Sequence, residues 1–196
     1  MIIKNIFKCL VFIIFVLNKT TYAQTKIDDV ISIKFPGKVE LFEQKEKDTY
    51  VRGYNFNSKK ESFIFVRSVP VKGDGSELKV PSKSFNKLIS KYKYTSKLLI
   101  EGFEKKTFIF SDSLLVSYEG FKAYKLIFKD KAKDKKMVES VMIDLNGVLY
   151  YGIYVMLTEF NEGRKNDFFN SLKINNPKNQ KQIVKPSFLE LFFNKN

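Results

Sequence analysis

The chain has one cysteine, no histidine and no tryptophan among its 196 residues. The cysteine, Cys9, lies in an N-terminal apolar stretch that we expect to be removed, so the remaining chain cannot form an internal disulfide. We therefore expect the packing of apolar side chains to hold the fold. Residues 24–196 are enough to bury one sizeable core.

The first 23 residues have the parts of an export signal. Lys4 and Lys8 give a positively charged start, and the apolar run 10–17 is too short to span a bilayer as a helix. Small residues precede the predicted cleavage point after Ala23. We predict that residues 1–23 are a signal peptide and that the rest is exported to the periplasm or the extracellular space. An uncleaved membrane anchor is the alternative.

The missing side chains also limit the chemistry. Without histidine or a retained cysteine, Ser-His and Cys-His catalysis are excluded, and acid–base work would fall to carboxylates, lysine or tyrosine. We therefore predict that the protein is not an enzyme and holds neither a metal nor a cofactor. A small carboxylate-based hydrolase is the remaining catalytic alternative. Asp144 is the most prominent acid because its neighbours are apolar, although a residue beside a hairpin turn can also face outward.

The formal net charge of +14 is the second strong compositional feature. Only Arg52, Arg67 and Arg164 are arginine, and lysine lacks the planar fork that binds phosphates in two-point fashion. Abundant lysine, asparagine, isoleucine and phenylalanine are also what A+T-rich coding produces. We interpret the charge as a solvated lysine surface, with a selected anion-binding face as the alternative. Export argues against nucleic acid as the partner.

The pattern of apolar residues predicts a β-rich start. Ile31, Ile33 and Phe35 alternate with polar residues, and two further β-rich runs cover 49–57 and 61–70. We predict that these runs form a β-meander.

Two segments have helical periodicity. Apolar residues recur every three or four positions from Ser82 onward, so we predict an amphipathic helix that ends near Thr95 or Phe103. A second helix is predicted over 162–172, with Phe168 and Phe169 facing inward.

The strongest turn signal is Asn146-Gly147, which tolerates positive φ at both central positions. Short strands are predicted over 107–112, 114–118 and 122–129, followed by a hairpin of 138–145 with 148–157. A two-residue turn pairs Ile143 with Tyr150 and Met142 with Tyr151. The aromatic residues of the second arm are candidates for a ligand-binding groove, with core packing as the alternative; they are Tyr150, Tyr151 and Tyr154.

The last segment, 175–196, is a basic linker followed by an apolar stub. The stub is a candidate contact for a membrane or a partner, and the alternative is that it folds back on the domain. The residues proposed for this contact are Phe188, Leu189, Phe192 and Phe193.

Four stretches resemble a family of exported bacterial PsbP-like domains. ISIKFPGKVELFEQ resembles the opening strand of that family, with its Phe-Pro-Gly end, and EGFKAYKLIF resembles its central strand after a Gly-aromatic turn. ESVMIDLNGVLYYGIYVM resembles the hairpin with an aromatic second arm, and NDFFNSLKI resembles the last helix and closing strand. The resemblance covers roughly Ile31 to Ile174.

This resemblance implies an α+β fold, a central antiparallel β-sheet flanked by helices in an α/β/α sandwich, over residues 24–174. It also implies an accessory protein without catalytic activity. We therefore expect an exported binding domain, a monomer or weak oligomer, whose partner is an unknown protein or envelope component. The alternative is a peripheral envelope protein that meets anionic lipid or polysaccharide through its lysines and the C-terminal stub.

Overall fold

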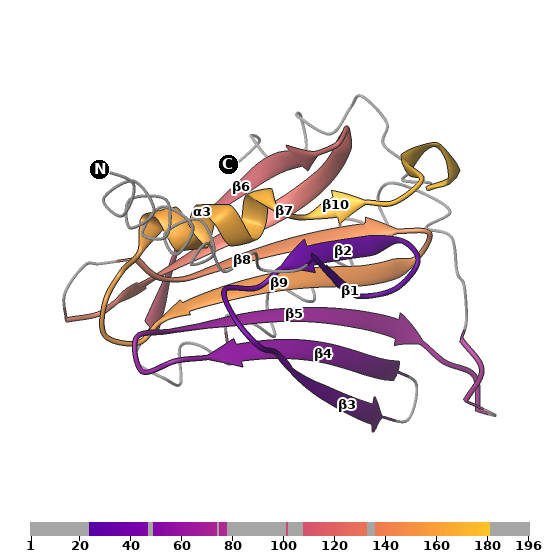
Figure 1. Cartoon of the computed structure of the whole chain (residues 1–196), viewed down its shortest axis with the longest axis horizontal. Helices are drawn as coiled ribbons and strands as arrows, with labels where there is room; N and C mark the ends of the chain where they lie inside the picture. Colours follow the sequence, from indigo (N-terminus) through magenta and orange to yellow (C-terminus); the bar gives the residue numbers. More distant parts are fainter. Residues whose placement is uncertain are drawn as a thin grey trace, which may run out of the picture.

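The computed structural model describes residues 24–46, 49–73, 75–77, 101, 108–132 and 136–180. Figure 1 labels the elements of this part of the chain. They are, in order, β1 (Gln24–Lys26), β2 (Ile31–Lys34), β3 (Glu40–Glu46), β4 (Thr49–Asn57), β5 (Glu61–Pro70), β6 (Phe108–Tyr118), β7 (Phe121–Asp130), β8 (Lys136–Leu145), β9 (Val148–Met156), α3 (Glu162–Asn170), β10 (Lys173–Ile174) and the 3₁₀ helix η1 (Pro177–Asn179).

Seven strands form one large antiparallel sheet in the order β3-β4-β5-β9-β8-β7-β6. Most neighbours in this sheet are also neighbours along the chain, so tight turns set most of the topology. The turn between β8 and β9 has positive φ at Asn146 (53°) and Gly147 (83°), as the Asn-Gly signal predicts. The predicted pairs Ile143–Tyr150 and Met142–Tyr151 are both present, so the predicted register is confirmed.

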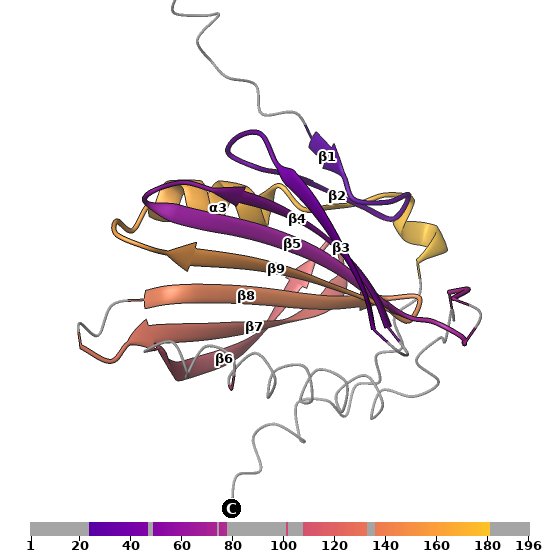
Figure 2. The same cartoon turned by 90° about the horizontal axis from the view of Figure 1, so that it is seen from below.

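A second layer covers one face of the large sheet. Strand β2 pairs with β1 on one side and with β10 on the other, which gives a small three-stranded sheet. Figures 1 and 2 show this small sheet and α3 on the same side of the large sheet. The side-chain oxygen of Asn161 accepts a hydrogen bond from the backbone N–H of Arg164 and caps the start of α3.

The core lies between these two layers. The alternating side chains of β2 point into it, since Ile31 and Ile33 are fully buried. Helix α3 contributes Phe168, whose ring centroid lies 5.3 Å from that of Phe35 and 5.1 Å from that of Phe63. The helix approaches β9 closely at Gly152, where an added Cβ would lie 3.3 Å from the ring of Phe169.

The expected fold class is wrong. Strands account for 62% of the described residues and helices for 11%, so this part of the chain is a β-rich fold and not a sheet flanked by helices. The alternation at 31–35 correctly predicted a strand, but we assigned it to the main meander. In the structure β2 pairs with β1 and β10 and occupies the layer where a helix was expected.

Two further differences concern strand lengths and coverage. The runs 107–112 and 114–118 were predicted as separate strands, but β6 is continuous and has an irregularity between Phe110 and Asp112. The helix predicted from Ser82 lies outside the described residues, apart from Glu101.

Candidate functional site

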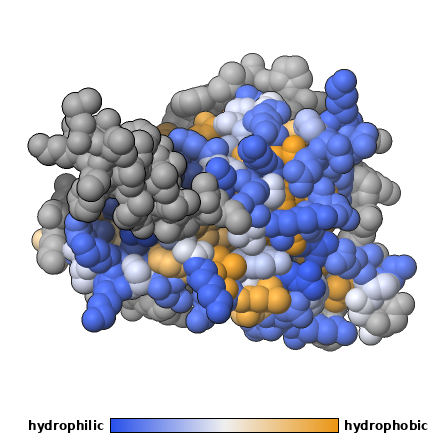
Figure 3. All heavy atoms as spheres, in the orientation of Figure 1, coloured by the Kyte–Doolittle hydropathy of each residue, from blue (hydrophilic) through white to orange (hydrophobic). Residues whose placement is uncertain are grey.

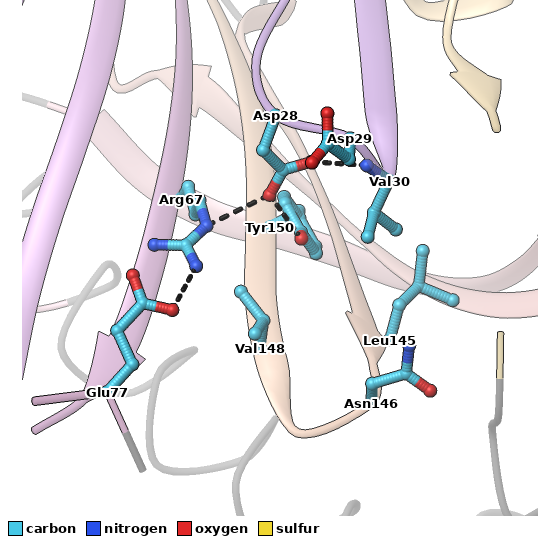
Figure 4. Close-up of a pocket in the computed structure, with 9 residues that line it drawn as sticks. All are labelled: Asp28, Asp29, Val30, Arg67, Glu77, Leu145, Asn146, Val148 and Tyr150. Atoms are coloured by element: carbon cyan, nitrogen blue, oxygen red, sulfur yellow. Dashed lines mark hydrogen bonds and ion pairs between the residues drawn. The ribbon is translucent and has the colours of Figure 1, made fainter. Parts of the chain in front are cut away.

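A pocket of about 280 Å³ lies where the β1–β2 connection meets β5 and the β8–β9 turn. Figure 4 shows the side chains that line it converging from these elements. One part of the lining is charged or polar and the other is apolar. The nine lining residues are Asp28, Asp29, Val30, Arg67, Glu77, Leu145, Asn146, Val148 and Tyr150.

Asp28 is the central acceptor of this pocket. Its Oδ1 accepts hydrogen bonds from the backbone N–H groups of Val30 (2.7 Å) and Ile31 (2.9 Å), which fixes the turn into β2. Its Oδ2 accepts from Arg67 Nε at 2.9 Å and from the hydroxyl of Tyr150 at 2.7 Å. One carboxylate therefore joins the loop, β5 and β9, as Figure 4 shows.

Arg67 is held between two carboxylates. Its Nε faces Asp28, and its Nη2 lies 2.7 Å from Oε2 of Glu77. Burial lowers the pKa of Arg67. The hydrogen bond and charge of Glu77, with smaller contributions from Tyr150 and Asp28, raise it by more, so the net pKa lies above the ordinary value. The guanidinium is thus a permanent positive charge at the base of the pocket.

Tyr150 supplies a neutral donor. Burial raises the pKa of its hydroxyl well above the ordinary value, and the charge of Asp28 and the hydrogen bond to it raise that pKa further. The hydroxyl therefore stays protonated at physiological pH and donates to Asp28. This geometry can bind and orient a ligand, and the Tyr150 proton is not poised for transfer near neutral pH.

A second charged cluster lies under α3. Lys165 on α3 and Lys125 on β7 each place Nζ 2.6 Å from an oxygen of Glu139 on β8. Burial raises the pKa of Glu139, but the two lysines lower it more, so its net pKa lies below the usual range. Next to this cluster, Arg164 pairs with the buried Glu61 at 2.6 Å. These ion pairs fasten α3 to the sheet.

The predicted aromatic groove is only partly assembled. Tyr150 lines the pocket, whereas Tyr154 is buried in the core, where its ring packs against that of Phe63 and, on the outer side, that of the exposed Phe160. Tyr151 has the opposite parity on β9, so its side chain lies on the other face of the sheet. The structure therefore does not bring the three tyrosines together.

The other predicted contact residues have different outcomes. Phe188, Leu189, Phe192 and Phe193 lie outside the described residues, as does the predicted signal peptide. Asp144 is buried, and its Oδ1 accepts a hydrogen bond from the backbone N–H of Gly147 at 3.1 Å. It stabilises the hairpin turn and does not face outward.

Sequence reasoning missed Asp28, Arg67 and Glu77. One signal was present, because Arg67 is the one charged residue in the mostly apolar run FIFVRSVP of a central strand. A charged residue in such a run needs a partner. Nothing in the local sequence identifies that partner, since Asp28 is 39 positions away.

Within 24–180, leaving aside the gaps given above, no three acidic, cysteine or histidine side chains come together in a way that could hold a metal ion. No helix in this part of the chain has the length and apolar character to cross a membrane.

Comparison with known proteins gives a likeness at the level of the fold. No protein-family model matches the chain, and no curated protein matches it. Among solved structures, it is similar to the solution structure of cyanobacterial PsbP (CyanoP) from Synechocystis sp. PCC 6803. The TM-score is 0.49 and the sequence identity 10%, over 80% of this chain and 95% of that one. The predicted resemblance to PsbP-like domains is confirmed to this extent.

Proposed function

We propose that this protein is an exported, non-catalytic binding domain whose ligand site is the pocket closed by Asp28, Arg67 and Tyr150. The pairing of its charged side chains supports binding over catalysis. Asp28, Arg67 and Glu77 satisfy one another, as do Glu139 and its two lysines. A general base or nucleophile needs a group that is released from such pairing.

The lining supports a small organic ligand. Leu145 and Val148 offer an apolar wall opposite the polar groups of Asp28 and Arg67. Apolar walls with a few fixed polar groups are typical of small-molecule sites. Among the described residues on the face seen in Figure 3, hydrophilic ones predominate and hydrophobic ones form small patches.

Ligand binding can be tested with three small probes of equal shape, benzoate, benzamide and benzylamine. We expect at least one of them to shift the backbone NMR signals of Val30, Asn146 and Val148. Val148→Phe should abolish these shifts because its ring fills the pocket. Val155→Phe is the matched control, since Val155 has the opposite parity on the same strand.

Thermal melting of both variants checks that they fold. The binding site is refuted if all three probes leave the pocket signals unchanged. Recovery of a probe in chemically altered form would refute the non-catalytic assignment.

The proposal of export rests on the leader and on the position of β1. Cleavage after Ala23 would leave Gln24, the first residue of β1, as the new N-terminus. Its side-chain amide donates to the backbone carbonyl of Ser171 at 3.0 Å, so cleavage at this point keeps the small sheet intact. Mass spectrometry of protein from the producing cells should show a chain that starts at Gln24. A full-length chain retained in the cytoplasm would contradict export.

A further inference from the structure

The ion pair between Arg67 and Glu77 differs from the other contacts of the pocket. The side chain of Arg67 is 12% exposed and that of Asp28 21%, whereas that of Glu77 is 37% exposed. Asp28 is tied by four hydrogen bonds from the loop, β5 and β9. The Nε of Arg67 is thus held by Asp28, and its Nη2 contacts Glu77, the most exposed of these three residues.

Glu77 belongs to a small turn after β5. An isolated β-bridge joins Glu77 to Val71, and two backbone hydrogen bonds, Lys72 N–H to Ser76 O and Gly75 N–H to Lys72 O, close the turn. Glu77 is also the more exposed partner of the pair, so water can solvate its carboxylate when the contact opens. A second carboxylate can therefore replace Glu77 on Arg67 more readily than it can replace Asp28, which four hydrogen bonds hold in place.

Resting on the proposed function, we propose that Glu77 occupies the place on Arg67 that the carboxylate of a ligand takes, and that the pocket binds a small carboxylic acid with an apolar body. The planar guanidinium fork matches a carboxylate in two-point geometry. The ligand's hydrocarbon part would lie against Val30, Leu145 and Val148, which line the same pocket.

The charge balance of the pocket agrees with such an exchange. Three carboxylates and one guanidinium line it, and Asp29 is offset by Lys26 at 2.6 Å. When Glu77 leaves and another carboxylate arrives, the local charge is unchanged. The net charge of +14 on the whole chain favours the approach of an anion.

The substitution Glu77→Gln separates this inference from binding of a cation. It keeps the shape of the side chain but removes the competing charge, so the Kd of benzoate should fall about two- to five-fold. A cation such as benzylamine would instead lose an attractive charge and bind more weakly. Kd values come from NMR titration of the full-length protein at low salt.

Two further variants complete the test. Arg67→Met should weaken benzoate binding by about tenfold or more, because a charge-assisted hydrogen bond is lost. Glu43→Gln is the matched control: Glu43 pairs with Arg52 at 2.7 Å on the exposed sheet edge and does not line the pocket, so its removal should leave the Kd unchanged.

The outcomes separate this inference from the proposed function. If benzylamine or benzamide binds in the pocket and benzoate does not, the carboxylate is refuted while the ligand site stands. If benzoate binds there but Glu77→Gln leaves its Kd unchanged or raises it, the exchange is refuted. If none of the three shifts the pocket signals, the ligand site and the inference fail together.

Discussion

Lys165→Met is expected to lower the free energy of unfolding by about 3–5 kcal/mol, because it leaves the buried carboxylate of Glu139 with one of its two lysine partners. Nζ of Lys165 lies 2.6 Å from Glu139, and the side chains of the two residues are 4% and 1% exposed. Lys125, the remaining partner, is 23% exposed and comes from the sheet. The loss would therefore weaken the attachment of α3. Urea unfolding followed by circular dichroism measures it.

A second substitution and the pH dependence of stability test whether the unpaired charge of Glu139 causes this loss. Glu139→Gln in the Lys165→Met background should restore part of the stability, since it removes the uncompensated charge. Because the folded-state pKa of Glu139 is lowered, its stabilisation is present above the ordinary carboxyl pKa and is lost as pH falls through the folded value. The difference between wild type and Lys165→Met should therefore shrink on acidification below about pH 4.

Lys173→Met is the matched control. Lys173 is exposed on β10, and its substitution should change stability by less than about 0.5 kcal/mol. A Lys165→Met protein that unfolds at the same urea concentration as Lys173→Met would contradict the role given to the buried ion pairs.

Phe168→Ala should destabilise the fold by about 3–5 kcal/mol by opening a cavity between the two layers. Phe168 is 1% exposed, and its ring contacts Phe35, Phe63 and Phe169. These neighbours come from the segment after β2, from β5 and from α3, so no single element can collapse into the space. Thermal unfolding should occur more than about 5 °C below that of the wild type.

Leu157→Ala removes a large apolar side chain that is 50% exposed. It should therefore change the melting temperature by little. Equal effects of Phe168→Ala and Leu157→Ala would mean that α3 does not seal the core as described.

The local elements were largely predictable, whereas their assembly was not. The Asn146-Gly147 turn sets the β8–β9 register by itself, because a two-residue loop allows one pairing. The alternation of Ile31 and Ile33 also correctly predicts a strand with one buried face. It carries no information about the partner strand, so β2 was assigned to the wrong sheet.

The site was less predictable than the fold because its contacts join distant positions. Asp28 and Tyr150 are 122 residues apart, and no local pattern links them. Tyr150 was selected for its aromatic neighbours, but parity on β9 separates it from Tyr151. Arg67 in an apolar strand was the one usable signal, and it indicates that an acidic partner exists without indicating which one.

The pairing of β2 with β10 has a consequence for how the chain matures. Ile31 pairs with Ile174, and the backbone N–H of Lys34 donates to Ser171 Oγ at 2.8 Å. A nascent chain emerging from the ribosome has to wait for β10 before this closure, because contacts so distant in sequence form late. Until β10 has been made the small sheet stays open, and the export that we propose would need a chain in this unfinished state.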